Sequence, residues 1–267
     1  MTGAKLPVIN PGVAHCARVY DYLLGGRDNF AADRAAGKQM IAALPGIVAA
    51  SRMNRAFLAR AVRFLAAECG IRQFLDIGTG LPSPGNTHEA AQQVAPQARV
   101  VYVDNDPIVL AHARAQLTST PEGAVAPLDA DLRQPDDILR TAAGTLDFQR
   151  PIALLMLLVL HMIPDTAMPH RIVARLAAAL PGGSYLALSH PASDIQPEAM
   201  AHMTRRLNAY LRPGESVTAR GRDEVARFFD GLDIVPPGLV RVHHWRPAGD
   251  TDPDAQPPIW CAVAHKP

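Results

Sequence analysis

Short apolar segments alternate with amphipathic segments in the middle of the chain. Five apolar segments have the length and composition of buried strands: residues 74–77, 100–103, 125–128, 152–160 and 185–188. The segments that separate them have helical periodicity, at residues 88–94, 108–117, 136–143 and 171–180. This alternation predicts a parallel sheet with helices on both faces, the doubly wound form of an α/β fold.

The N-terminal part has a helical pattern throughout. Between residues 19 and 70, apolar side chains recur with a period of about 3.6 residues, most clearly from Met53 to Leu65. Three turns rich in glycine or proline interrupt this pattern, at Gly25-Gly26, Pro45-Gly46 and Gly70. They predict three helices, and the double glycine either ends a helix or forms the hinge of a lid. We therefore expect an N-terminal helical cap over residues 1–70 and a core over residues 71–267.

The C-terminal part departs from the regular alternation. Residues 197–211 and 223–229 have helical patterns, and residues 239–242 and 259–264 are two further strand candidates. Residues 247–258, between these strands, are rich in proline and aspartate and suit a hairpin connection. The complete pattern predicts a Rossmann-like, mostly parallel seven-stranded sheet with an antiparallel edge hairpin and an N-terminal helical cap.

Charge and hydropathy exclude several classes of protein. The 267 residues include 26 Lys and Arg against 25 Asp and Glu, and no run of like charges predicts a nucleic-acid-binding tail. The longest apolar run, residues 152–160, is too short to span a bilayer, and residues 1–13 lack the apolar core of a secretory signal. We expect a cytoplasmic protein that binds neither nucleic acid nor membrane; the pattern indicates no oligomeric state.

The cysteine and histidine spacing predicts no metal site. Cys16, Cys69 and Cys261 are far apart and have neither the Cys-x-x-Cys spacing of zinc sites nor that of a disulfide framework. His243 and His244 lack the helical pairing with a further ligand that metal sites use. We expect no metal ion and reduced cysteines, as in the cytoplasm.

A glycine-rich turn follows the first predicted strand, at Gly78-Thr79-Gly80. Without Cβ atoms, such a turn lets a ligand approach the backbone closely, although a tight strand-to-helix turn has the same sequence. Asp104 ends the second strand, where a carboxylate can accept both ribose hydroxyls; alternatively it caps the next helix. Asp131 and Leu132 follow the third strand and suit an adenine amino group and ring, or a turn. Together these strand ends predict a nucleotide-binding crevice.

Asp76 favours a methyl donor over a dinucleotide. An acidic side chain two residues before the first loop glycine can face the ammonium group of a methionine moiety, whereas it would repel a pyrophosphate. The third glycine of the dinucleotide motif is also missing, since Pro82 and Ser83 follow Gly80 at that spacing. NAD(P) is therefore the alternative cofactor, and S-adenosylmethionine the preferred one.

These motifs resemble class I S-adenosylmethionine methyltransferases, and more closely an actinobacterial family, once a domain of unknown function, now described as S-adenosyl methyltransferases. The resemblance covers nearly the whole chain and rests on residues 18–30, 54–57, 74–84 and 102–107. The Tyr-Asp-Tyr-Leu-Leu-Gly-Gly stretch, residues 20–26, is far more specific than the glycine loop. Pro82 departs from the broad superfamily, which often has a third glycine there.

The resemblance also implies roles for individual residues. Asp76 and the loop Gly78-Thr79-Gly80 would hold the methionine end of the cofactor. Asp104 with Asn105 would hold the ribose, and Asp131 with Leu132 the adenine. The acceptor is not implied, because the fourth strand end lacks the Asn-Pro-Pro-Tyr sequence of base methyltransferases and is more similar to that of small-molecule methyltransferases.

Candidate residues for the acceptor lie at two strand ends and in the cap. His161 is a candidate general base, or a histidine hydrogen-bonded to the backbone; His190 is a second candidate, or part of a turn before Pro191. Four cap residues could cover the cofactor and shape an acceptor pocket, or simply pack at the cap interface: Tyr20, Tyr22, Asn29 and Asn54.

Three functions are compatible with these features. The first is a methyltransferase acting on a small molecule, in which positioning supplies much of the acceleration. The second is an NAD(P)-dependent oxidoreductase, against which Asp76 and the missing third glycine argue. The third is a non-catalytic sensor of S-adenosylmethionine, which the motifs do not separate from the first.

Overall fold

The computed structural model describes residues 10–247, 249 and 255–267. Within these residues, eight strands form one sheet in the order β3-β2-β1-β4-β5-β8-β6, with β7 also paired to β8. The strands are β1 (Gln73–Ile77), β2 (Arg99–Asp104), β3 (Ala124–Asp129), β4 (Ala153–Leu157), β5 (Tyr185–Pro191), β6 (Asp233–Ile234), β7 (Val240–Arg241) and β8 (Ile259–His265). The first five are parallel, and β8 is antiparallel to β5. The predicted Rossmann-like fold is confirmed.

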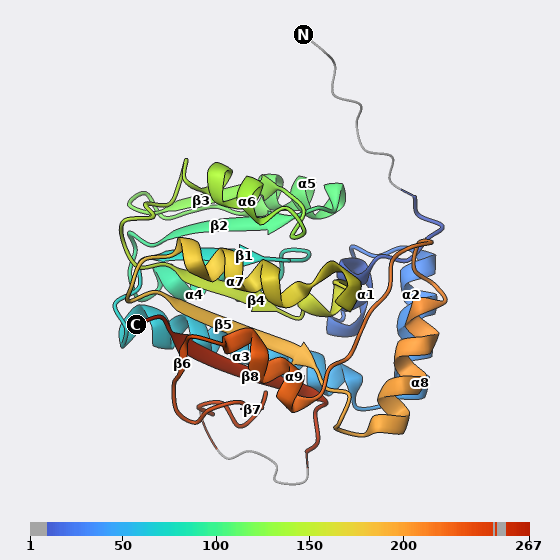
Figure 1. The fold of residues 1–267 in the computed structure, drawn as a ribbon. Helices are drawn as coiled ribbons and strands as arrows, with labels where there is room; N and C mark the ends of the chain where they lie inside the picture. Colours follow the sequence, from blue (N-terminus) through green and yellow to red (C-terminus); the bar gives the residue numbers. More distant parts are fainter. Residues whose placement is uncertain (1–9, 248, 250–254) are drawn as a thin grey trace.

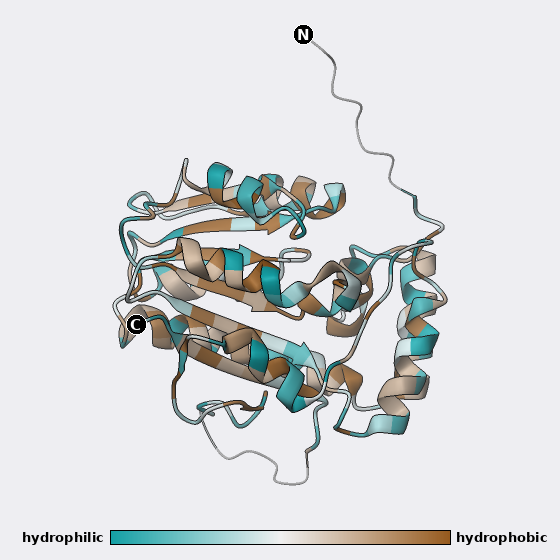
Figure 2. Cartoon of the chain, viewed as in Figure 1, coloured by the Kyte–Doolittle hydropathy of each residue, from teal (hydrophilic) through white to brown (hydrophobic). Residues whose placement is uncertain are grey.

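Helices cover both faces of the sheet, as predicted (Figure 1). One face packs against α3 (Ile47–Ala67) and α4 (Thr87–Gln92). The other packs against α6 (Pro135–Ala142), α7 (Pro169–Ala179) and α9 (Arg222–Ala226), with η3 (Arg227–Phe229). The central strands are mostly hydrophobic and the helices mixed (Figure 2). Successive side chains of β1 point to opposite faces of the sheet. Phe74 packs in the apolar cluster with α3 and α4, and Leu75 packs in the cluster with α6, α7 and α9.

A third layer lies beyond the carboxyl ends of the parallel strands. It consists of α1 (Cys16–Leu24), α2 (Ala31–Ala43) and α8 (Pro197–Asn208), which share one apolar cluster. α5 (Pro107–Gln116) begins just after β2 and packs beside β3. The three predicted N-terminal helices are α1, α2 and α3, and α3 packs on the sheet rather than in the third layer. A domain boundary at residue 70 stays a prediction.

Two predicted elements differ from the structure. The predicted strand over residues 152–160 ends at Leu157, because Leu158 has φ +50° and the chain turns into the 3-10 helix η1 (Leu160–Met162). A second such turn, η2 (Asp165–Ala167), follows. The strand β6 was not predicted, since it consists of two exposed residues with no apolar pattern.

The edge of the sheet explains the strand count. Both β6 and β7 pair with the edge of β8 that faces away from β5, β6 near His265 and β7 near Trp260 and Cys261. β6 and β7 therefore share one position at the edge of the sheet, so that eight strands fill the seven positions that were predicted. The predicted hairpin is formed by β7 and β8, and residues 248 and 250–254 of its loop lie outside the described residues. Residues 1–9, which are part of the segment considered for a secretory signal, also lie outside them. No helix in the described part of the chain is long and apolar enough to cross a membrane.

A buried ionic cluster attaches the third layer to the sheet. Arg18 of α1 is 2% exposed; its Nε donates to Asp33 Oδ2 of α2 over 2.9 Å, and its Nη1 to Asp106 Oδ2 over 3.1 Å. Asp106 is also the N-cap of α5, where its Oδ1 accepts from the Ile108 amide over 2.8 Å. One guanidinium therefore joins two helices of the third layer to the loop after β2.

We expect Arg18→Met to lower the free energy of unfolding by about 3–5 kcal/mol, because both carboxylates would stay buried without their common partner. Urea unfolding followed by circular dichroism measures the change. The control is Arg140→Met, which removes an exposed pair with Asp137 and should cost less than about 1 kcal/mol. Equal losses in the two variants would show that the buried cluster does not hold the layer.

Candidate active site

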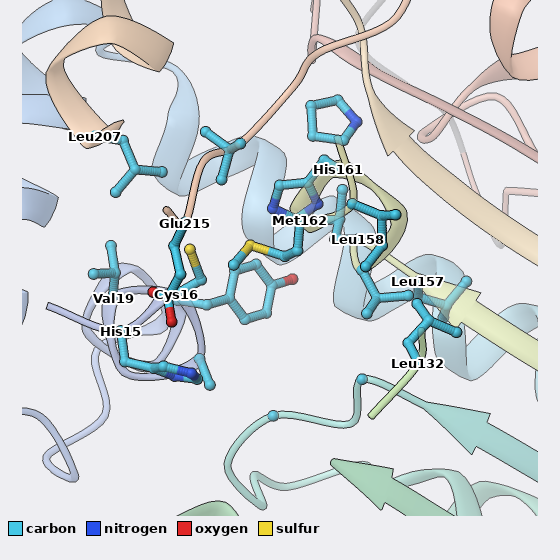
Figure 3. Close-up of a pocket in the computed structure, with 18 of the residues that line it drawn as sticks. His15, Cys16, Val19, Leu132, Leu157, Leu158, His161, Met162, Leu207 and Glu215 are labelled. Carbon is cyan, nitrogen blue, oxygen red and sulfur yellow. The ribbon is translucent and has the colours of Figure 1, made fainter. Parts of the chain in front are cut away.

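A cavity of about 380 Å³ lies between the carboxyl ends of the strands and the helices of the third layer. This is within the range of roughly 300–1,000 Å³ that small-molecule sites occupy. Figure 3 shows Leu132, Leu157 and His161 on its strand side, and Val19 and Leu207 on its helical side. The cavity is where open α/β sheets bind their ligands.

The glycine loop forms one wall of this cavity. Gly78 has φ +73° and Gly80 has φ +65°, in the left-handed region that favours glycine. A Cβ atom on Gly78 would lie 2.2 Å from Val159 Cγ2, so no other residue fits there without a shift. Thr79, between the two glycines, also lines the cavity. The backbone of the loop thus faces the cavity, and its binding of the methionine end of a cofactor stays a prediction.

Asp104 fixes the loop to the end of β2. Its Oδ2 accepts from the Gly80 amide over 3.0 Å, and its Oδ1 from the Asp106 amide over 2.9 Å. Burial raises the pKa of this carboxyl group, and the two amides oppose the shift. Each carboxylate oxygen can accept more than one hydrogen bond, so the side chain retains acceptor capacity toward the cavity, which Asn105 also lines.

Asp76 is a buried carboxylate at the end of β1. It is 5% exposed, and its Oδ2 accepts from the Thr87 hydroxyl at the start of α4 over 2.6 Å. Burial raises its pKa to about 6, and the Thr87 hydrogen bond and the charge of Arg55 oppose that rise. A positive charge in the cavity would therefore favour the ionised form of Asp76 and lower its pKa.

Asp131 and Leu132 lie together at the rim after β3. Asp131 is paired with Arg133, and the Arg133 side-chain hydrogen bond is the main cause of its lowered pKa. Leu132 is buried and lines the cavity beside Leu157. Both residues predicted to bind adenine therefore line the cavity, Leu132 with an apolar side chain and Asp131 with a carboxylate that is already paired with Arg133.

His161, on η1, points into the cavity (Figure 3). Its Nδ1 is buried and has no hydrogen-bond partner within the described chain. Burial, helped by the charge of Arg220, lowers the pKa of this histidine to about 4. The ring is therefore neutral at pH 7.

The structure does not bring His190 into the cavity. Its Nε2 accepts from Arg220 Nη1 over 2.9 Å, because a guanidinium only donates. Its Nδ1 consequently carries the proton and donates to the Pro191 carbonyl over 2.9 Å. Arg220 also donates to the Leu160 and Ile163 carbonyls and to Asp165. His190 thus helps Arg220 to fix the turn that carries His161.

The four cap candidates separate into two pairs. Tyr20 and Asn54 line the cavity, where the Asn54 amide donates to the Tyr20 hydroxyl over 3.1 Å and accepts from Ser189 Oγ over 2.7 Å. Tyr22 instead lies against Gly37 of α2, and Asn29 donates to Asp21 over 2.7 Å. Neither of this second pair lines the cavity.

Several lining residues were not predicted from the sequence. They include His15, Cys16, Met200, Met203 and Glu215. Burial raises the pKa of the Cys16 thiol to about 12, so it stays protonated. The methionines follow the apolar face of α8 and had no feature that distinguishes them from core residues. Among the described residues, no three histidine, cysteine or acidic side chains are grouped to hold a metal ion.

Comparison with known proteins shows what the chain is related to. A family model described as S-adenosyl methyltransferase matches residues 3–267. A crystal structure of a DUF574 family protein from Streptomyces avermitilis is 43% identical, with a TM-score of 0.91 over 96% of this chain and 98% of that one. A putative methyltransferase from Thermobifida fusca is 41% identical, with a TM-score of 0.87 over 96% of both chains.

More distant structures share the fold alone. A SAM-dependent methyltransferase from Anabaena variabilis is 15% identical, with a TM-score of 0.54 over 100% of this chain and 99% of that one. The search of curated proteins gives no match. The full-length family match confirms the methyl donor as cofactor over the alternative, NAD(P). The chain belongs to the S-adenosyl methyltransferase family.

Proposed function

We propose that this methyltransferase acts on a small molecule bound in the cavity described above, in the cytoplasm and without a nucleic-acid partner. The observation that carries the proposal is the continuity of one cavity from the glycine loop to the apolar faces of α1, α2 and α8. A donor held at the first end and an acceptor held at the second would be positioned to react within one cavity.

The residues at the strand ends fit S-adenosylmethionine. Asp76 offers a buried negative charge to the ammonium group, and Gly80 leaves open space beside the backbone of the loop. Asp104 offers acceptor oxygens to the ribose hydroxyls, and Leu132 an apolar wall to the adenine. When bound, the cofactor supplies an electrophilic methyl group on a sulfonium.

The protein's own contribution is to position the acceptor and to receive a proton. A hydroxyl acceptor becomes strongly acidic as it gains the methyl group, so even a weak base beside it suffices. His161 is neutral and lines the cavity, and we assign it as this base. The hydrogen-bonded row of Tyr20, Asn54 and Ser189 fixes the neighbouring wall.

Isothermal titration tests the cofactor half of the site. We expect micromolar binding of S-adenosylmethionine and S-adenosylhomocysteine and none of NADPH. Asp104→Ala should weaken the binding of both by about 1–3 kcal/mol, because hydrogen bonds to a charged acceptor are lost. Asp137→Ala, at an exposed position outside the cavity, is the control. An unchanged titration curve for Asp104→Ala would remove this residue from the ribose site.

Cofactor binding should depend on pH through Asp76. Its pKa of about 6 in the free protein would fall beside a cationic ammonium group, so binding below pH 6 must release a proton. Affinity for S-adenosylhomocysteine should therefore rise as pH increases from 5 to 7, by up to about tenfold per unit below the pKa, and then level off. Titration at several pH values measures this.

The Asp76→Asn variant serves as the comparison for that pH dependence. Its amide can still accept from Thr87 but carries no charge, so we expect weaker binding, by roughly 10–100-fold at pH 7.5, and no pH dependence in this range. A pH profile that stays the same in the variant would assign the titration to another group.

His161→Ala should separate proton transfer from cofactor binding. We expect S-adenosylhomocysteine affinity within a factor of about two and a methyl-transfer rate lowered by about 10²–10⁴-fold, the usual contribution of general base catalysis. Single-turnover measurement with an acceptor found by screening gives the rate. Equal rates in variant and wild type would return His161 to a structural role.

A further inference from the structure

The helical side of the cavity includes an apolar chamber, although the polar side chain of Thr204 on α8 also lines the cavity. We define this acceptor chamber by six lining residues of α1, α2, α3 and α8: Val19, Met40, Ile47, Met200, Met203 and Leu207. All six are buried and belong to one apolar cluster. Three of them are methionines, whose flexible thioether side chains adapt to ligands of irregular shape.

The charged side chains around the cavity already have partners of opposite charge or lie at the cofactor end. Asp106 is held by Arg18, with His15 Nδ1 also 2.9 Å from its Oδ2. Asp131 is paired with Arg133. Among the described residues, Glu215 is then the carboxylate still to be considered at the acceptor chamber.

Glu215 is the one carboxylate that approaches the chamber from the strap over it, residues 212–219. Its side chain is 36% exposed and lies 4.0 Å from Arg212 Nη1, whose side chain is 44% exposed. Figure 3 shows Glu215 near Cys16, at the side of the chamber away from the strand ends. The pair therefore lies at the solvent side, and its charges balance one another.

One buried polar atom on the strand side of the cavity lacks a partner. His161 Nδ1 is buried and unbonded within the described chain, whereas the Tyr20 hydroxyl already donates to the Ser51 carbonyl over 3.0 Å. His161 also lines the cavity and points into it (Figure 3), so a ligand hydroxyl group can hydrogen-bond to its imidazole ring there.

We infer that the acceptor is an uncharged, mainly apolar molecule with one hydroxyl group, which places its apolar body in the acceptor chamber and its hydroxyl group at His161. This inference rests on the proposed function. A charged acceptor would lose its hydration on entering the chamber and find no compensating charge there, which is a large cost. An apolar body instead gains from leaving water.

Three probes of one shape and different charge test the inference: 4-ethylphenol, 4-ethylbenzoate and 4-ethylbenzylamine. Each is titrated into wild-type protein saturated with S-adenosylhomocysteine. We expect the neutral phenol to bind at least about tenfold more tightly than either charged probe. Equal or tighter binding of a charged probe would overturn the inference, and so would no detectable binding of the phenol.

A charge placed in the chamber should reverse this preference. Met203→Glu is expected to weaken phenol binding and to favour 4-ethylbenzylamine by at least about tenfold. Met168→Glu is the matched control, because Met168 is 48% exposed and does not line the cavity. An unchanged ranking in a folded Met203→Glu variant would place the probes elsewhere; if that variant does not fold, the wild-type ranking alone decides.

The titration of S-adenosylhomocysteine without a probe separates the two levels of inference. If the wild-type protein does not bind it, the proposed function fails at the cofactor site. If it binds while the neutral probe shows no preference, the cofactor site stands and only the inferred acceptor class is wrong.

Discussion

The buried guanidinium of Arg18 is the interaction on which the arrangement of the site depends. It has carboxylates on two sides, Asp33 in α2 and Asp106 at the start of α5, and its loss would leave both without their common cationic partner. The contacts continue inward, because the Asp106 amide donates to Asp104 and Asp104 accepts from the Gly80 amide. The helices that enclose the acceptor end are thus linked, bond by bond, to the loop that forms the cofactor end.

A second arginine has the equivalent role on the other side of the cavity. Arg220 is 1% exposed and holds the turn after β4 through the Leu160 and Ile163 carbonyls. Its contact with His190 joins this turn to the end of β5. Burial is the main reason that the His161 pKa is lowered, and the charge of Arg220 adds to it. The residue that fixes the turn therefore also helps to keep the ring neutral.

The fold could be predicted from the sequence where a periodic pattern and a local backbone requirement coincide. The strands β1 to β5 and the glycine loop meet that condition, although the apolar run through Leu158 concealed a backbone turn. Side-chain direction was harder to predict. Tyr20 and Tyr22 are two residues apart on a helix and so point to nearly opposite sides, and only Tyr20 reaches the cavity. The methionines of the chamber have the same spacing as core residues, so no local signal marks them.

The helical layer also has a consequence for biosynthesis. α1 and α2 leave the ribosome first, but the helix that covers their apolar faces, α8, comes after β5 in the chain. Until then the apolar side chains of α1 and α2 lack the helix that completes their cluster, since the contacts that close it are separated by most of the sheet. The nascent chain therefore exposes these side chains throughout synthesis of the central strands. Such transiently exposed apolar surface is prone to aggregation until α8 is made.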